Sequence, residues 1–485
     1  MGAGDPDFIV VGAGPNGLVA ACVLARAGAR VLVLEAHETR AGGALGSEEG
    51  TLPGYVHDVG AAFFPFARAS PAFQDLDLEG AGLTWLNMEL ESCHPAPDGS
   101  FACISRDHDV SARLMGDARD GDAWRRLATW HGTIERDLLA FLLRPLPTVR
   151  PLLRLLPFDL LRIARILMAS GAGLSRRLFR GEPARRVLPG LALHVDVGPD
   201  DWFGAGLGYM LGLTATTGGY CIPRGGAGQV TAALVELLRR YGGVVRLGAR
   251  VDKILVEGRR ARGVRAQTAD GPEEIAANKA VLANTDVARL FLELVDRQHL
   301  PGRVIRKMRR FPRGWGTFKL DWALSGPVPW AIPEARKSAV VHAGDSLDDL
   351  RRFTAQVRGG DLPENPYLVI GQQSLADPTR APAGGHTLWA YSRVPPTLPG
   401  GWRASAEAFA DRVDARIEAL APGFRALVRA RRAVAPPDLE AMDANLVGGD
   451  LGGGSNAWHR QLIFRPLFPY FRYRTPVRGL YLCSS

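Results

Sequence analysis

The opening 35 residues restrict the fold more than any other part of the sequence. Phe8 to Val11 is a short apolar run that predicts a buried strand, and it ends in the turn Gly12-Ala13-Gly14-Pro15-Asn16-Gly17. An apolar helical face follows as far as Gly28, and a second apolar run, Arg30 to Leu34, ends on Glu35. This order and spacing indicate a dinucleotide-binding unit, which consists of a strand, a glycine turn, a helix, a second strand and an acid.

The glycines of this turn each have a physical role. We expect Gly12 to allow the sharp turn, Gly14 to let the backbone approach a pyrophosphate, and Gly17 to let the helix pack closely on the strands. The amino terminus of the helix offers unpaired N–H groups and a partial positive charge to phosphates. Glu35 is expected to accept hydrogen bonds from both ribose hydroxyls, and its charge disfavours the 2′-phosphate of NADP.

A second glycine pair follows the ribose acid, in Arg40-Ala41-Gly42-Gly43. Glycines here allow the chain to run close over a flavin and its diphosphate, and Arg40 can neutralise phosphate charge, so this segment favours FAD over NAD. The alternative interpretation is a glycine-rich loop without a ligand.

Composition excludes several classes of protein. A chain of 485 residues suggests two or three structural units, and 46% hydrophobic with 22% charged residues argues against wholesale disorder. The net charge of +9 permits an anionic cofactor, nucleic acid or an acidic membrane surface without selecting one. Five cysteines, with no C-x-x-C pair and no Cys/His grouping at zinc spacing, argue against a disulfide framework, a dithiol flavoenzyme and a metal site.

Longer motifs carry a family resemblance. Val10 to Glu35 with Arg40 to Gly43 resembles the FAD-binding start of the phytoene desaturase and amine oxidase superfamily, and Gly219 to Gly228 resembles that family's re-entry into its FAD domain. Asp321 to Trp330 and Asp377 to Tyr391 are similar to the phytoene dehydrogenase-like branch, which includes pyridine nucleotide-disulfide oxidoreductase domain-containing protein 2. The resemblance covers nearly the whole chain.

The resemblance implies an α/β fold, with a Rossmann-type FAD-binding domain of the GR2-like flavoprotein type and an inserted α+β substrate domain. The FAD-binding domain is expected in residues 1–85, 218–300 and 435–485, and the substrate or lid domain in 86–217 and 301–434.

The resemblance also implies further cofactor contacts. The backbone of Val251 is expected at the adenine side of FAD and the Ala283-Asn284 turn near the dinucleotide, although the residues alone equally allow Val251 to be core. The predicted FAD-contacting residues are Gly12, Ala13, Gly14, Pro15, Asn16, Gly17, Glu35, Ala36, Arg40, Gly42, Gly43 and Val251.

The middle of the chain predicts one nucleotide site. Gly226-Ala227-Gly228 opens no second nucleotide fold, because Thr231 stands at the place of the third glycine and no acid-tipped strand follows. A transient electron acceptor, oxygen or a quinone, is therefore expected to reoxidise the flavin. Val244 to Leu247, Arg250 to Val256 and Gly263 to Ala266 are expected to form an antiparallel ribbon that ends at a buried strand, Lys279 to Asn284.

Leu138 to Phe179 is rich in leucine and arginine, and Pro145, Pro147, Pro151 and Pro157 divide it into short pieces. It predicts either a peripheral membrane contact that feeds an oily substrate to the pocket or an amphipathic lid on the substrate domain. The uncharged stretch Trp202 to Pro223 is too rich in glycine and threonine to predict a membrane span. No targeting signal is evident, so we expect a cytoplasmic location, or the mitochondrial matrix in a eukaryote.

No catalytic residue is predicted. Asp58, His342 and His386 are the acid/base candidates to examine, each with an ordinary hydrogen-bonding role as the alternative. The aromatic residues after the second glycine pair are interpreted as a wall of the flavin or substrate site, or equally as core: Phe63, Phe64 and Phe66. The basic run Arg303 to Arg313 is expected to be a solvated helix face, so no nucleic acid partner is predicted.

These features predict a FAD-dependent oxidoreductase that transfers hydride between flavin and an apolar substrate. The substrate is expected to be a polyene, an isoprenoid or a lipid-like molecule. Desaturation as the reaction is implied by the resemblance alone. The alternatives are a flavin-dependent isomerase or saturase and a non-catalytic FAD-bound interaction protein. In the family, the strand matching Arg478 to Cys483 leads into a glycine-rich loop and a closing helix over the flavin. Their absence here indicates a truncated gene product, a fragment or a natural short form.

Overall fold

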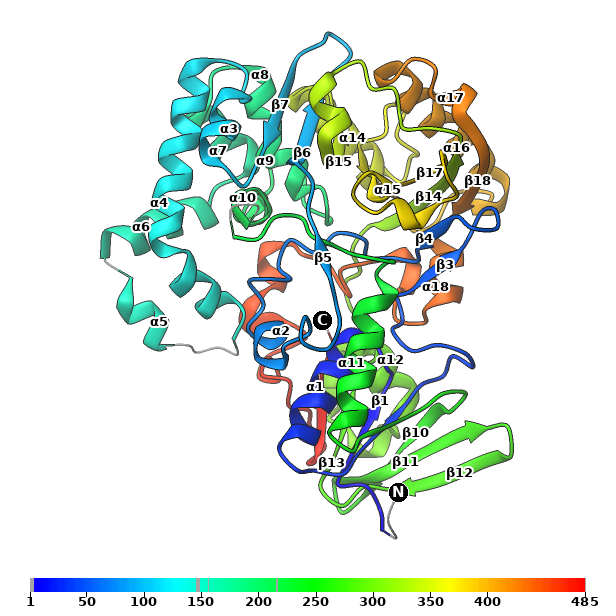
Figure 1. Cartoon of the computed structure of the whole chain (residues 1–485). Coiled ribbons are helices and arrows are strands. Elements are labelled where there is room, and N and C mark those ends of the chain that lie inside the picture. The colour runs from blue at the N-terminus through cyan, green and yellow to red at the C-terminus, as the bar shows by residue number, and fades with distance from the viewer. Residues whose placement is uncertain (1–3, 145–148, 156, 215–216, 485) are drawn as a thin grey trace.

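Two sheets organise the molecule (Figure 1). The computed structural model describes residues 4–144, 149–155, 157–214 and 217–484. In Figure 1 the smaller, five-stranded sheet lies in the lower part and the larger, seven-stranded sheet in the upper part. The smaller sheet takes its strands from residues 8–34, 244–283 and 480–482, and the larger from 90–104 and 316–434. The boundary residues of the predicted domains stay a prediction.

The smaller sheet is parallel throughout, in the order β19-β13-β1-β2-β9. Its strands are β1 (Phe8–Val11), β2 (Val31–Leu34), β9 (Val244–Arg246), β13 (Ala280–Ala283) and β19 (Leu480–Leu482). Ile9 and Val11 join the core cluster on one face and Val10 and Val33 the cluster on the other, as expected where both faces of a parallel sheet are covered. With helices α1 (Pro15–Arg26) and α11 (Gly228–Arg240) packed together on it, this sheet confirms the predicted Rossmann-type α/β unit.

One strand assignment was wrong. Val244–Arg246 does not belong to the antiparallel ribbon but pairs in parallel with β2, through Leu32 and Val244. The ribbon consists of β10 (Arg250–Glu257), β11 (Arg260–Thr268) and β12 (Gly271–Ala276). A short β-branched run fits either sheet, and only the position of α11 directs this strand back beside β2.

The larger sheet has the order β18-β14-β17-β16-β15-β6-β7 and is antiparallel except where β15 pairs with β6. Its strands are β6 (Leu90–Pro95), β7 (Phe101–Ile104), β14 (Gly316–Leu324), β15 (Ser338–Ala343), β16 (Leu368–Gly371), β17 (His386–Val394) and β18 (Val428–Val434). Phe318 packs on Trp402 and Phe409, so helix α16 (Trp402–Leu420) covers one face.

Helices from the middle of the chain form a layer that contacts the larger sheet at its edge strand β7. They are α3 (His108–Arg113), α4 (Ala118–Leu142), α5 (Val149–Arg154), α6 (Pro157–Leu167), α7 (Gly171–Leu178), α8 (Glu182–Arg185), α9 (Val187–Ala192), α10 (Gly204–Thr214) and α14 (Leu347–Gly359). The leucine-rich stretch is divided into short helices, although Pro145 and Pro147 lie outside the described residues. None of the described helices combines the length and the apolarity that crossing a membrane requires.

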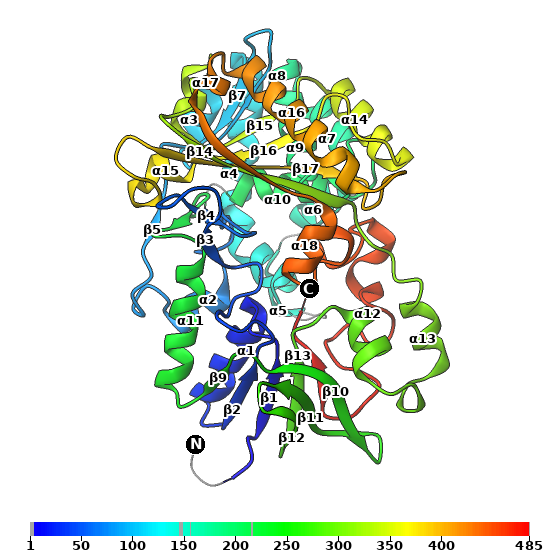
Figure 2. The same ribbon diagram turned by 90° about the vertical axis from the view of Figure 1, so that its right-hand side faces the viewer.

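The shorter described elements connect these parts. They are β3 (Ser47–Glu49), β4 (Val56–Asp58), β5 (Trp85–Leu86), β8 (Ile222–Pro223), α2 (Pro71–Leu76), α12 (Val287–Arg289), α13 (Gly302–Met308), α15 (Gln373–Ala376), α17 (Phe424–Leu427) and α18 (Pro436–Met442), with one π-turn (Leu290–Leu294) and short 3₁₀ turns such as Pro378–Arg380, Trp458–Arg460 and Leu462–Phe464. In Figure 2, α18 lies between the larger sheet and the Rossmann unit. The basic residues of α13 are exposed, as expected of a solvated face.

Candidate functional site

A cavity of about 640 Å³ lies at the carboxyl ends of β1 and β2. Nine of the twelve predicted FAD-contacting residues line it: Gly12, Gly14, Pro15, Asn16, Glu35, Ala36, Arg40, Gly43 and Val251. Its volume is within the range of about 300 to 1,000 Å³ that is typical of cofactor and ligand sites. The structure therefore brings most of the predicted residues around one space.

The glycine turn leaves no room for side chains. Gly12 has a φ of +93°, and a Cβ atom there would lie 2.8 Å from the carbonyl oxygen of Asn284. A Cβ on Gly14 would overlap the side-chain amide of Asn284, and one on Gly17 would lie 2.6 Å from the carbonyl oxygen of Gly12. The bare backbone of this turn forms one wall of the cavity, as close approach to a pyrophosphate requires.

Three predicted contact residues do not line the cavity: Ala13, Gly17 and Gly42. They shape the site instead. The N–H group of Ala13 donates to Glu35, while Gly17 sets the close packing of α1 on the turn. Gly42 has a φ of +113°, and its N–H group donates to the carbonyl oxygen of Ala13 (2.9 Å), which joins the second glycine pair to the first turn.

The Glu35 carboxylate is held by backbone N–H groups at the end of β2. One oxygen accepts from Ala13 (2.7 Å) and the other from His37 (2.9 Å). The side chain is half-buried and lines the cavity, so it keeps lone pairs for further donors. This geometry suits a ligand with a pair of adjacent hydroxyl groups.

Positive potential lies beside this carboxylate. Helix α1 begins after Gly14 without a side-chain cap, so its amino-terminal partial charge faces the cavity. Arg40 lines the same cavity, and its Nη1 donates to the carbonyl oxygen of Gly43 (2.9 Å). The cavity thus combines an anion-binding helix terminus with a fixed cation.

Residues from distant parts of the chain complete the cavity. Asn284, expected from the resemblance to lie near the dinucleotide, lines it, and Val251 both lines it and belongs to a core cluster. Contact between Val251 and adenine stays a prediction. Sequence reasoning missed an ion pair between Arg289 and Glu440 (2.6 Å) and the segment 440–445 after α18. No motif marks that segment, because only the fold brings it beside the glycine turn.

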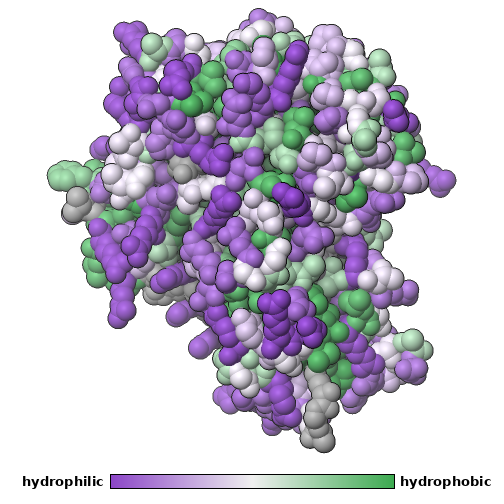
Figure 3. Space-filling model, in the orientation of Figure 1, coloured by the Kyte–Doolittle hydropathy of each residue, from purple (hydrophilic) through white to green (hydrophobic). Residues whose placement is uncertain are grey.

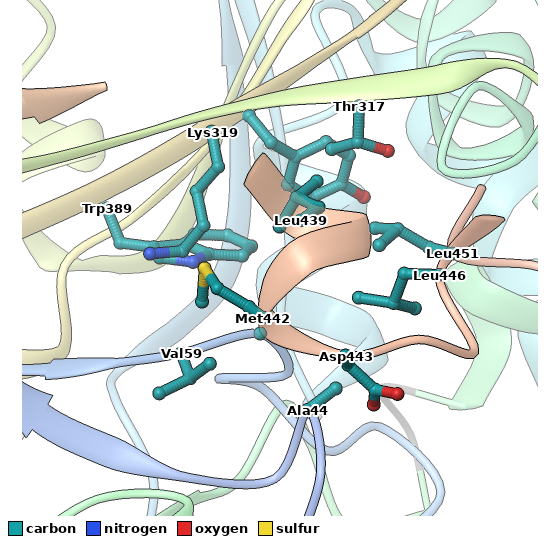
Figure 4. A pocket seen from close by; sticks show the side chains of 12 residues that line it. Ala44, Val59, Thr317, Lys319, Trp389, Leu439, Met442, Asp443, Leu446 and Leu451 are labelled. Carbon is teal, nitrogen blue, oxygen red and sulfur yellow. The ribbon is translucent and has the colours of Figure 1, made fainter. Parts of the chain in front are cut away.

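A second, inner compartment of about 30 Å³ adjoins the cavity (Figure 4). It shares Ala44, Met442 and Asp443 with the larger cavity. Figure 4 shows Lys319 and Trp389 extending from the larger sheet towards Met442 of α18, with Val59 and Ala44 on the opposite side. The remaining lining residues are Gly60, Thr317, Tyr391, Leu439, Leu446 and Leu451. The dinucleotide cavity therefore ends against an apolar and aromatic wall that the larger sheet supplies.

Of the three predicted aromatic residues, Phe63 supports this wall from behind, whereas Phe64 and Phe66 lie elsewhere. The Phe63 ring packs on Trp389, with 6.2 Å between centroids. Phe64 packs on Trp85 in the core under the Rossmann helices (5.4 Å), and Phe66 is half-buried. Phe63 thus positions a lining residue, while Phe64 is core.

Asp58, the first acid/base candidate, belongs to a buried clamp beside the inner compartment. Its carboxylate forms an ion pair with Arg380, each side chain being 1% exposed. The same carboxylate accepts from Ser47 (2.8 Å) and from the N–H group of Ala227 (2.7 Å), and Ser47 in turn accepts from Gly228 (3.0 Å). The start of α11 is therefore occupied by protein side chains, in agreement with a single nucleotide-binding turn.

The two histidine candidates lie away from both cavities. His342 stacks on His94 with 4.6 Å between ring centroids and shares a hydrogen bond with His194 (2.9 Å). Burial lowers the pKa of His94 and His194 to about 3 and holds that of His342 well below its usual value. His386 contacts Ser374 at 3.2 Å, and burial lowers its pKa as well. Neither candidate lines the site.

Comparison with known proteins relates this site to a family. The family description "NAD(P)-binding Rossmann-like domain" matches residues 10–76. Hydroxyneurosporene desaturase of Cereibacter sphaeroides is 30% identical over 379 residues, which cover 75% of this chain and 71% of the relative. The chain belongs to the phytoene desaturase-like family of FAD-dependent oxidoreductases. It is accordingly an oxidoreductase enzyme.

Two further comparisons agree with this family assignment. The phytoene desaturase-like chain is 28% identical over 536 residues to mouse pyridine nucleotide-disulfide oxidoreductase domain-containing protein 2, covering 99% of this chain and 89% of the relative. A solved structure of putrescine oxidase has a TM-score of 0.57 at 18% identity, covering 99% of this chain and 93% of the other. The α/β fold with a Rossmann-type domain that the resemblance implied is thus confirmed.

Proposed function

We propose that this phytoene desaturase-like protein binds FAD and transfers hydride between the flavin and an apolar, polyene, isoprenoid or lipid-like substrate. The observation that carries the proposal is that the two spaces adjoin: the dinucleotide cavity and a largely apolar compartment under the larger sheet share Ala44, Met442 and Asp443 as lining residues. FAD, when bound, supplies a ring nitrogen that accepts or returns a hydride.

The described residues that line the cavity suit the parts of such a cofactor. The α1 terminus and the bare Gly14 suit the pyrophosphate, Glu35 the adenosine ribose, and Val251 the adenine. A carboxylate at residue 35 repels a 2′-phosphate, which favours FAD over NADP. Arg40 supplies a balancing charge.

The inner compartment supports the apolar substrate. Trp389, Leu439 and Leu446 exclude water there, and hydride transfer from carbon needs exclusion of water and orientation more than a titratable catalyst. Lys319 is the one cation among the compartment's lining residues; it is 5% exposed and its Nζ is ion-paired with Asp321. The pair contributes little net charge to the compartment, and the other charged lining residue, Asp443, is shared with the larger cavity.

The test begins with the visible absorption spectrum of the purified protein and identification of any nucleotide released on denaturation. Anaerobic titration with polyenes and isoprenoids follows. Reduction of the flavin by substrate alone supports dehydrogenation, after which oxygen and quinones are compared as acceptors. Activity that requires a prior reductant would instead indicate a saturase or isomerase. Flavin that stays oxidised with every lipid would indicate a non-catalytic protein, and a colourless protein would contradict the proposal.

A further inference from the structure

A buried histidine, His57, faces a buried aspartate, Asp321, beside the inner compartment. His57 is 3% exposed and Asp321 is 2% exposed, and 3.7 Å separates the ring Nδ1 from the carboxylate Oδ1. Neither of these two atoms has a hydrogen-bond partner among the described residues. A buried polar atom without a partner costs free energy. One further proton between the ring and the carboxylate would satisfy both.

Lys319 links this pair to the inner compartment. Lys319 and Asp321 lie two residues apart on β14, so their side chains share one face of the strand, and the Lys319 Nζ is ion-paired with the second carboxylate oxygen of Asp321. Lys319 lines the inner compartment and also a narrow crevice, whose wall includes His57 and Asp321. Val59 and Met442 line both spaces as well. Polar atoms therefore lead from the compartment wall to His57.

The other side of the His57 ring leads to the surface. Its Nε2 lies 2.8 Å from the hydroxyl oxygen of Thr51, which is partly exposed between β3 and β4. In Figure 3, hydrophilic side chains protrude at the right edge of the molecule, where Figure 1 places β3 and β4. The two ring nitrogens thus face Asp321 on the inner side and Thr51 on the outer side. A proton that reaches the ring from Asp321 has a way out to water.

The charged groups that face His57 balance one another in three ion pairs. The pairs are Lys319–Asp321, Arg380–Asp58 and Arg432–Glu48. Burial therefore decides the charge of the ring, and it lowers the pKa of His57 to about 4 against the opposing effect of Asp321. The ring is neutral at pH 7 and has room for a proton. Negative charge that arrives in the adjoining compartment would favour uptake of that proton.

Formation of a carbon–carbon double bond releases a hydride and a proton together. One C–H bond breaks and its electron pair leaves with the hydrogen to the flavin, while the neighbouring C–H bond breaks and its electron pair becomes the new double bond. The first event brings negative charge to the flavin. The second leaves a proton in a compartment whose wall is mostly apolar. A proton acceptor beside this wall is therefore required.

We propose that Lys319, Asp321 and His57 form a proton relay that accepts the proton from the substrate and passes it to solvent. The Lys319 Nζ gives a proton to the Asp321 carboxylate and takes up the substrate's proton in its place. Asp321 passes its proton to the His57 Nδ1, and Nε2 releases one to Thr51 and water. While the proton stays on the ring, its charge balances that of the hydride. The relay rests on the proposed function, because it completes the hydride transfer.

Reduction of the bound flavin with dithionite tests the relay without a substrate, because it brings the same negative charge to the site. The dependence of the flavin midpoint potential on pH counts the protons taken up. We expect about two protons per flavin in the wild type, one on the flavin and one on His57, and about one in His57→Gln. Equal counts in the two proteins would overturn the proposal. Loss of a proton in Asp443→Asn instead would also overturn it, because Asp443 is the other carboxylate that lines the compartment.

His131→Gln is the matched control for the loss of a buried histidine. His131 is also buried and lies 3.2 Å from a carboxylate, that of Glu135, but it lines neither cavity. This variant should keep the proton count of the wild type. An equal loss of a proton in His131→Gln and His57→Gln would show a general effect of buried histidines and would contradict the relay.

Nitrogen-15 NMR of histidine-labelled protein gives a readout that is independent of turnover. The His57 ring, identified by its loss in His57→Gln, should change from neutral to protonated when the flavin is reduced at pH 7; an unchanged ring would overturn the proposal. In the apoprotein, Lys319→Met should raise the pKa of His57, because the cation that balances Asp321 is removed. An unchanged pKa would show that the three groups are not coupled, which also overturns the relay. A colourless protein, or flavin that no lipid reduces, contradicts the proposed function alone.

Discussion

The side-chain amide of Asn284 lies directly against Gly14. In the orientation that satisfies both ends of the amide, its oxygen accepts from the Gly14 N–H group (3.1 Å) and its nitrogen donates to the carbonyl oxygen of Cys483 (3.1 Å). The residue after β13 therefore joins the first turn of the Rossmann unit to the end of its last strand. The backbone at residue 14 is held in place, and a side chain added there would displace the Asn284 amide.

Gly14→Val should abolish flavin binding. The new side chain would overlap the Asn284 amide and occupy the space left for a pyrophosphate. The ratio of flavin to protein absorbance measures the effect. Gly132→Ala is the matched control, because Gly132 lies in α4 with open space around it and alanine favours a helix. Full flavin content in the valine variant would disprove the site.

Glu35→Gln should weaken FAD binding about tenfold to a hundredfold, because hydrogen bonds from hydroxyls to a charged acceptor are each stronger than those to an amide. Titration of the apoprotein with FAD, followed by flavin fluorescence, gives the dissociation constant. Glu38→Gln removes an exposed charge three residues away that does not line the cavity, and it should leave the constant unchanged. Equal dissociation constants for FAD in the wild type and in both variants would argue against contact between Glu35 and the ribose.

Arg380→Met should destabilise the fold by about 3–5 kcal/mol, because it leaves the Asp58 carboxylate buried without its partner. Urea unfolding measures the loss. Lys337→Met is the control, since its ion pair with Glu89 is largely exposed and such pairs contribute little. Comparable losses in the two variants would show that burial of the Asp58–Arg380 pair has no special role.

Stability should fall as the pH drops from 7 to 5. His94, His194 and His342 are neutral in the fold because burial lowers their pKa, and Arg186 and Arg393 beside them lower the pKa of His94 and His194 further. The unfolded chain takes up their protons below about pH 6.5, so each histidine removes about 1.4 kcal/mol per pH unit in this window until its folded pKa is reached. Urea unfolding at each pH gives the free energy of unfolding, and its slope against pH measures the protons taken up on unfolding. His94→Phe should reduce this slope by the equivalent of about one proton. A wild-type slope of zero would contradict this assignment.

Predictions from the sequence were correct where a structural element depends on residues a few positions apart. Residues 8–35 form strand, turn, helix and strand because their apolar spacing and glycines act over a few positions, and most of the residues singled out between Gly12 and Gly43 line one cavity. Prediction failed for Val244–Arg246, whose composition fits either sheet and whose partner, β2, lies about two hundred residues earlier.

The amino-acid sequence alone therefore determined the Rossmann unit, its glycine turn and the position of Glu35 at the end of β2. Only the tertiary structure decided what closes the site. The segment 440–445 and the Asp58–Arg380 clamp each join residues hundreds of positions apart. Such contacts depend on how whole elements pack, because the apolar spacing of a short stretch shows which face is buried and not which distant element covers it.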